Sequence, residues 1–157
     1  MIERISTLRQ SVTLGKETPI ENGPTCHGAA FEILNADGSV DTTRDFARLV
    51  ITRRYPENGL LFSQNDGSEE EVEITSGRGY LLRLKASGFM SRIALKPGNK
   101  LKIPQGDLFA WVSQSTDTPD EALTFDMICR PGFDPEKYHY VEHKIKKQQA
   151  NNVTEDE

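Results

Sequence analysis

From about Leu49 onward, the chain divides into short segments rich in branched and aromatic residues, each separated from the next by Gly, Pro, Asn or Asp. This pattern is typical of an all-β sandwich or barrel, because each segment has the length of a strand and each break carries turn-forming residues. The predicted strands are Leu49–Arg53, Glu71–Thr75, Gly79–Lys85, Phe89–Leu95, Lys100–Ile103, Leu108–Ser113 and Leu123–Arg130. They leave little room for helix in this part of the chain.

Alternation inside the predicted strands assigns side chains to the two faces of a sheet. In the segment Leu108–Ser113, Phe109 and Trp111 share one side, whereas Leu108 and Ala110 share the other. The last predicted strand carries an apolar row on one side, which consists of Leu123, Phe125, Met127 and Cys129. A row of this kind can cover a core.

The 157 residues suffice for one domain with a single core, and three parts can be distinguished within them. Residues 1–45 are expected to form an N-terminal arm that packs on the barrel or on a partner subunit. Residues 46–135 are expected to form the barrel. Residues 136–157 are expected to form a short C-terminal helix and a frayed tail.

Local signals define the two end regions. In the arm, short strands are predicted at Ser11–Leu14 and Ala30–Leu34, and Asn35–Gly38 has the composition of a hairpin turn. The C-terminal helix is predicted over Glu136–Gln148, where Tyr138, Val141 and Ile145 would share one face.

The charge pattern argues against a nucleic-acid partner. The formal net charge of -5 arises from 24 acidic and 19 basic residues that are mostly interspersed, whereas a phosphate-binding surface needs clustered cations. No apolar run is long enough to cross a bilayer, so no membrane partner is expected. Cys26 and Cys129 lack metal-type spacing, and the start of the chain lacks the apolar region of a secretion signal, so we expect a cytoplasmic protein with buried thiols.

One spacing carries a family resemblance. Gly98 is followed by five residues, Pro104, one residue, Gly106, two residues and Phe109. This segment resembles the second motif of the cupin superfamily, in which a metal-binding histidine stands where Phe109 stands here. The resemblance implies a cupin-like double-stranded β-helix, which is a jelly-roll barrel, and it implies a homodimer.

The first cupin motif has a weaker counterpart. Glu70 lies six residues before Gly77, as the motif glutamate does, and Gln64 and Asp66 occupy the positions of its two histidines. Metal-binding cupins use three histidines and this glutamate, and the chain keeps only the glutamate. Because a phenyl ring offers no lone pair to a metal, the usual centre is expected to be absent, and we expect no metal and no other cofactor.

The candidate ligand-binding residues are Gln64, Asp66, Glu70, Tyr80, Phe109 and Trp111. Phe109 and Trp111 either line a cavity that stacks a ring or fill a barrel that has no site. Tyr80 shares a face with Leu82 and Leu84, which favours a core or pocket-wall role.

Glu70 allows two interpretations. Inside the barrel, desolvation would raise its pKa into the range useful for proton transfer. Alternatively, it is one of several acids in Asp66–Glu73 that lie on a solvated loop and strand edge.

Three functions are consistent with these residues. The first hypothesis is a small-molecule-binding protein, with a small organic or carbohydrate-like ligand in an aromatic-lined barrel mouth. The second is a metal-independent enzyme that resembles the sugar isomerases and epimerases of the superfamily, in which Glu70, Asp66 or Tyr80 would move protons. The third is a weak metal site built from Gln64, Asp66 and Glu70, because oxygen atoms can bind a hard cation.

Overall fold

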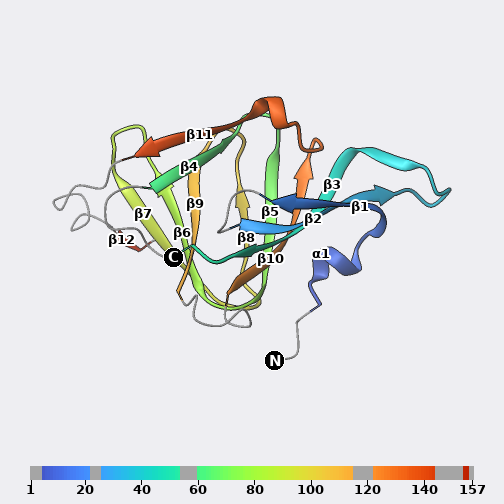
Figure 1. The fold of residues 1–157 in the computed structure, drawn as a ribbon, viewed down its shortest axis with the longest axis horizontal. Helices are drawn as coiled ribbons and strands as arrows, with labels where there is room; N and C mark the ends of the chain where they lie inside the picture. The colour runs from blue at the N-terminus through green and yellow to red at the C-terminus, as the bar shows by residue number, and fades with distance from the viewer. Residues whose placement is uncertain (1–4, 22–25, 54–59, 115–121, 144–153, 156–157) are drawn as a thin grey trace.

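The structure is a computed structural model in which residues 5–21, 26–53, 60–114, 122–143 and 154–155 are described. It is an all-β protein built from two sheets of six strands each (Figure 1). Every strand pairing is antiparallel except that between β12 and β7 among the described residues. None of the described helices has the length and hydropathy needed to span a membrane.

The first sheet has the strand order β1-β2-β3-β10-β5-β8. Its strands are β1 Thr13–Glu21, β2 Cys26–Leu34, β3 Val40–Ile51, β10 Leu123–Arg130, β5 Glu69–Ser76 and β8 Lys100–Ile103. The second sheet has the order β11-β4-β9-β6-β7-β12. Its strands are β11 Tyr138–His143, β4 Leu60–Asn65, β9 Leu108–Ser113, β6 Gly79–Leu84, β7 Met90–Leu95 and β12 Thr154–Glu155. The barrel is not closed, because no described strand of one sheet pairs with a strand of the other.

The predicted all-β class is confirmed, and three predicted strands have the observed bounds, namely β8, β9 and β10. The predicted turn at Asn35–Gly38 is also confirmed: it joins β2 to β3, and Gly38 has a φ of 87°. The sequence prediction missed β4. It also began β3 only at Leu49, whereas the strand begins at Val40 and crosses the expected boundary near residue 45.

The predicted helix at Glu136–Gln148 is wrong in the part that the structure describes. Pro135–Lys137 form a single 3-10 turn, and Tyr138–His143 then form β11, which pairs with β4. Aromatic and β-branched residues favour strands, and the edge of β4 offers backbone partners that an isolated helix would not have. Residues 144–148 of that prediction lie outside the described residues.

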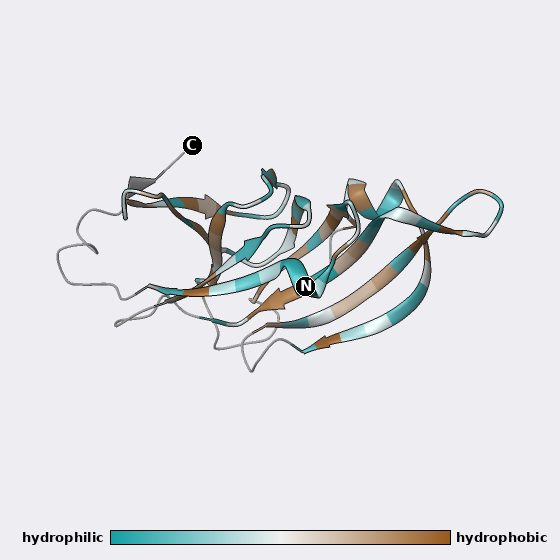
Figure 2. Ribbon diagram, turned by 90° about the horizontal axis from the view of Figure 1, so that it is seen from above, coloured by the Kyte–Doolittle hydropathy of each residue, from teal (hydrophilic) through white to brown (hydrophobic). Residues whose placement is uncertain are grey.

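The main core lies between the two sheets. Phe109 and Trp111 of β9 belong to it, and so do all four apolar residues that were predicted to share one side of β10. The predicted alternation is therefore confirmed in both strands. Figure 2 shows the same alternation of polar and apolar residues along the strands of the first sheet.

A short helix covers the outer face of the first sheet. α1 (Thr7–Gln10) begins after Ser6, whose Oγ accepts the backbone N–H of Arg9 at 2.9 Å. The same hydroxyl donates to Asp126 Oδ2 of β10 at 2.5 Å, so the cap also fastens the helix to the sheet. Leu8 packs there against Phe46 in a second apolar cluster.

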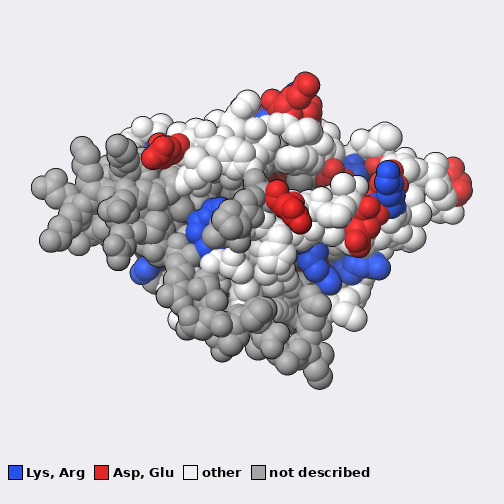
Figure 3. Space-filling view, in the orientation of Figure 1, with Lys and Arg blue, Asp and Glu red and all other residues white. Residues whose placement is uncertain are grey.

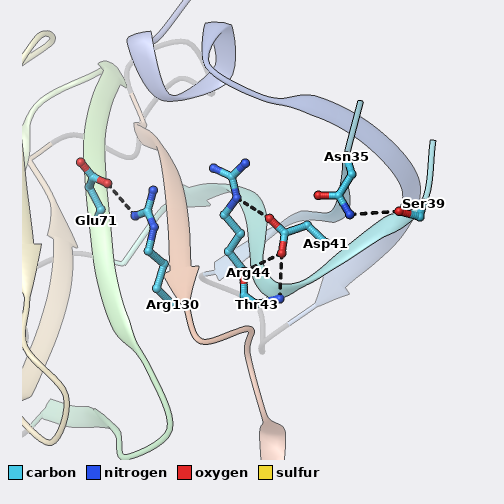
Figure 4. Close-up of polar contacts among 7 residues, drawn as sticks. All are labelled: Asn35, Ser39, Asp41, Thr43, Arg44, Glu71 and Arg130. Carbon is cyan, nitrogen blue, oxygen red and sulfur yellow. Dashed lines mark hydrogen bonds and ion pairs between the residues drawn. The ribbon is translucent and has the colours of Figure 1, made fainter. Parts of the chain in front are cut away.

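Polar contacts fix the β2–β3 hairpin, which projects away from the two-sheet body (Figures 1 and 4). Asn35 Nδ2 donates to Ser39 Oγ at 3.0 Å across the turn. Asp41 accepts from the Thr43 hydroxyl at 2.6 Å and from Arg44 Nε at 2.8 Å. Figure 3 shows that Lys and Arg side chains lie beside Asp and Glu side chains over this end of the molecule.

An ion pair spans β10 and β5 on the outer face. Arg130 Nη1 lies 2.8 Å from Glu71 Oε1, as Figure 4 shows. Since side chains alternate along β5, Glu71 points away from the space between the sheets and its neighbour Glu70 points into it. Glu70 therefore places a carboxyl group in the space between the two sheets.

Candidate functional site

A cavity of about 370 Å³ opens between the two sheets. Most of its wall is apolar and comes from the inward-facing side chains of β3, β9 and β10, including Ala47, Trp111 and Met127. This volume lies within the range of ~300–1,000 Å³ that is usual for small-molecule sites. The cavity is therefore the candidate functional site.

One end of the cavity carries a row of three titratable side chains. β10 pairs with β3 and with β5, so that Cys129 lies opposite Asp45 on one side and opposite Glu70 on the other. All three residues line the cavity. Two carboxyl groups therefore flank one thiol on the inner face of the first sheet.

Glu70 is almost completely buried, with an exposed fraction of 2%. Burial is the main reason why its pKa rises from 4.5 to about 7; a hydrogen bond from Asn65 lowers the pKa, and the charge of Asp45 raises it. At neutral pH the carboxyl group is thus present in both its acidic and its basic form. The interpretation of Glu70 as a solvated surface acid is wrong.

Burial also raises the pKa values of the other two members of this row, Asp45 and Cys129. Burial raises the pKa of Asp45, while hydrogen bonds from the Phe133 backbone N–H, at 2.8 Å, and from the Cys129 thiol lower it. Burial, and then the charges of Glu70 and Asp45, raise the pKa of Cys129. The thiol therefore stays neutral at pH 7 and is a poor nucleophile.

Aromatic side chains of β11 form the opposite wall of this end. Tyr138 lies across from Asn65 in the β11–β4 pairing and packs against Phe133 and Tyr140 at ring-centroid distances of 5.3 and 5.4 Å. Burial raises the pKa of Tyr138, the charge of Glu70 raises it further, and a hydrogen bond with Ser63 lowers it. The phenol keeps its proton at neutral pH and can donate a hydrogen bond.

Trp111 forms an aromatic part of the wall. Its ring lies 4.3 Å from that of Phe125 and 6.2 Å from that of Phe109, so the indole is held in a fixed orientation. Arg53, which follows β3, and Cys26, the first residue of β2, also line the cavity. Burial raises the pKa of Cys26 and the guanidinium of Arg53 lowers it, which places a positive charge near this thiol.

The residues around Glu70 do not fit the metal centre that the cupin resemblance implies. Among the described residues, no three His, Cys, Asp or Glu side chains gather closely enough to hold a metal ion. The inward-facing side chain of β4 near Glu70 is Ser63, and the residue at the position of the lost histidine, Phe109, is a buried part of the core. An imidazole donor is thus missing from the cavity wall.

Of the six sequence-predicted site residues, Glu70 and Trp111 line the cavity. Phe109 lies behind the wall in the core. Tyr80 lies on the outer face of the second sheet, where it packs with a separate apolar cluster and the guanidinium carbon of Arg92 stands 4.7 Å from its ring.

The other two predicted residues also lie outside the cavity. Gln64 Nε2 donates to the Gly106 carbonyl at 2.9 Å, and Asp66 Oδ2 lies 3.3 Å from His139 Nε2 on the surface. The structure therefore does not bring Gln64, Asp66 and Glu70 together as a set of metal ligands.

The polar residues of the site that sequence reasoning missed include Asp45, Ser63, Tyr138 and Tyr140. Alternation from Asp45 through Ala47 and Leu49 carried a signal for the first, because these residues face one side of a single strand. Tyr138 and Tyr140 were missed because the segment that contains them was predicted to be a helix. Ser63 lies in β4, which had not been recognised as a strand.

Comparisons with known proteins agree with the fold. No protein-family model matches the chain, and no curated protein matches it in sequence. Among solved structures, a substituted variant of Streptomyces Pac13 with uridine has a TM-score of 0.55 at 13% identity, over 88% of this chain and 94% of that chain. Pac13 itself, whose structure is similar to the same extent, is described as a nucleoside dehydratase.

Two other similar structures belong to longer chains. The 7S globulin of Momordica charantia has a TM-score of 0.57 at 17% identity, over 85% of this chain and 37% of the globulin. A Bacillus subtilis oxalate decarboxylase variant has a TM-score of 0.52 at 16% identity, over 82% of this chain and 30% of the decarboxylase. At such identities these likenesses concern the fold alone, and they show that it is cupin-like.

Proposed function

We propose that this protein binds a small, ring-containing organic molecule, such as a carbohydrate, a nucleoside or a cyclic ketone, in the cavity between its sheets. The observation that carries the proposal is the cavity itself, of about 370 Å³, with an apolar wall and a few polar groups gathered at one end. Specific small-molecule sites have this composition, because the apolar wall supplies affinity and the polar groups orient the ligand.

The polar groups suit a ligand with hydroxyl or carbonyl groups. The carboxyl group of Glu70 and the hydroxyl groups of Ser63 and Tyr138 include both donors and acceptors. Trp111 offers an aromatic surface in the same cavity against which a ring can pack. A variant of Pac13, whose fold is similar, has a solved structure with uridine. Uridine is therefore the first compound to test.

The test is a titration of the purified protein with three probes, which are uridine, methyl glucoside and the bicyclic ketone 2-tetralone. Trp111 is the single tryptophan of the chain, so its fluorescence reports directly on the cavity wall. We expect saturable quenching, together with a higher melting temperature, for at least one of the three probes. The proposal fails if none of the three changes either signal.

We also propose that the protein is a homodimer, as the cupin resemblance implies. β1 lies at an edge of the first sheet, and sheet edges present backbone groups that can pair with another chain. Light scattering on the eluted protein should give twice the mass of one chain, and a single-chain mass would contradict this proposal.

A further inference from the structure

The polar end of the cavity holds a carboxyl group that is only partly engaged. Asn65 Nδ2 donates to Glu70 Oε2 at 3.1 Å, and no other described side chain hydrogen-bonds this carboxyl group. Oε1 is therefore available to a molecule in the cavity. Because Glu70, near the start of β5, is paired with Cys129 of β10 on one side and with Ile103 of β8 on the other, its position is fixed before a ligand arrives.

The charged and titratable groups that face Glu70 come from three strands. Asp45 of β3 and Cys129 of β10 lie in its row, and Tyr138 of β11 faces it across the cavity end. Asp45 is the only carboxyl group among these three, and its negative charge makes Glu70 a stronger base. Tyr138 supplies a phenol close enough to Glu70 for the charge of that carboxyl group to raise the pKa of the phenol.

We propose that Glu70 is a general base in this cavity and that Tyr138 donates a hydrogen bond to the substrate oxygen that gains negative charge. This inference rests on the proposed binding function and assigns a reaction class to the same site. The substrate class is a ring-containing molecule with a C–H bond next to a carbonyl group. The reaction is an isomerisation through an enolate.

Atoms and electrons balance without a further reactant. Glu70 forms an O–H bond with the proton that leaves the carbon atom, and the electron pair of the broken C–H bond forms a C=C bond. The former C=O electrons move to the oxygen atom, which accepts the hydrogen bond from Tyr138. Glu70 then returns the proton to carbon. Delivery to a different carbon atom of a conjugated enolate gives an isomer, and delivery of a deuteron to the original carbon atom in heavy water gives an exchange of hydrogen for deuterium.

The protonation states of the two residues support these roles. The pKa of Glu70 is about 7, so near neutral pH a large fraction of the protein carries the basic carboxylate. Burial keeps the pKa of Tyr138 above its usual range, and the phenol remains a donor over the same interval. A base and a neutral donor thus coexist at one pH.

The probe for the test is 2-tetralone, a bicyclic ketone with acidic C–H bonds next to its carbonyl group. Exchange of these protons in heavy water is followed by proton NMR, and binding is followed separately by Trp111 fluorescence. We expect exchange above the buffer rate, with a rate that rises with pH through an apparent pKa near 7. Glu70→Gln should lower this rate at least tenfold, to near the buffer rate, because an amide cannot take the proton.

Two further variants separate catalysis from structure. Tyr138→Phe should lower the exchange rate about tenfold or more while the apparent pKa still follows Glu70. Glu71→Gln changes the neighbouring outward-facing acid of β5 and should leave the rate unchanged. If 2-tetralone binds but exchanges at the buffer rate, or if Glu70→Gln exchanges like the unaltered protein, the general-base role is refuted and the binding function stands. If no probe binds, the proposed function itself fails.

Discussion

Asn65 holds Glu70 through an amide group whose orientation is fixed from its other side. Its Nδ2 donates to Glu70 Oε2 at 3.1 Å, while its Oδ1 accepts the backbone N–H groups of Gly67 and Ser68 at 3.1 and 3.0 Å. The turn after β4 therefore determines which way the amide points. The Asn65 side chain therefore both stabilises this turn and holds the carboxyl group of Glu70.

The first prediction concerns this shared side chain. Asn65→Ala should raise the pKa of Glu70 further above 7, because the hydrogen bond from Asn65 favours the charged form. It should also lower the free energy of unfolding by about 1–3 kcal/mol, since the buried N–H group of Ser68 and the partly buried N–H group of Gly67 lose their acceptor. A carbon-13 NMR titration of the Glu70 carboxyl group measures the pKa, and an unchanged value would contradict the role given to Asn65.

The second prediction concerns the pH dependence of stability. Glu70 has a pKa of about 7 in the folded protein against 4.5 without burial, so from pH 4.5 to 7 the folded state keeps a proton that the unfolded state has lost. The stabilisation is complete below pH 4.5 and is lost as pH rises through 7. Over this interval the free energy of unfolding should fall by about 3 kcal/mol.

Urea denaturation at several pH values checks this sign. In Glu70→Gln most of the fall between pH 4.5 and 7 should disappear, because the amide is neutral throughout; Asp45, whose pKa is also raised by burial, contributes a remaining fall of the same sign. Glu71→Gln is the matched control and should keep the fall. Asp41 does not interfere, because its pKa is lowered to about 2 and its opposite contribution lies at more acidic pH. A fall of the same size in Glu70→Gln would show that other groups cause it.

The strands that the sequence predicted well are those in which local pattern and tertiary environment agree. β10 has an apolar row that faces the core, and a turn with a glycine precedes each of β8 and β9. β11 was predicted as a helix because its residues also fit a helical period. The edge of β4 decided in favour of a strand, and a long-range pairing of this kind leaves no local signal.

The site was less predictable than the fold for the same reason. Glu70 and Trp111 were found because a motif spacing and a strand alternation pointed to them. Asp45 and Tyr138 lie about 25 or more residues from these in the chain and reach the cavity only through the pairing of β3 with β10 and of β11 with β4. Pairing between distant strands is set by the whole fold, so the row of Asp45, Cys129 and Glu70 could not be predicted from spacing.

The third prediction concerns a close approach of two strands. A Cβ atom on Gly79 would overlap the carbonyl oxygen of Val112 across the β6–β9 pairing, and backbone cannot move aside cheaply there. Gly79→Ala should lower the free energy of unfolding by about 3 kcal/mol. The comparison is Gly88→Ala, where the φ of 87° is strained for alanine but the space is open, so the cost should be nearer about 1 kcal/mol. Equal losses in chemical denaturation would contradict the steric argument.

The last prediction tests the cavity without touching its polar end. Ala47 faces inward from β3 and lines the wall, so Ala47→Phe should place a ring in the space that the ligand needs. Binding of uridine or 2-tetralone should weaken at least tenfold, while the free energy of unfolding should change by about 1 kcal/mol or less, because the added ring enters open space rather than packed core. Ala94→Phe, at an exposed position of β7, is the matched control and should leave binding unchanged. Full binding by Ala47→Phe, measured through Trp111 fluorescence and thermal shift, would place the ligand somewhere other than this cavity.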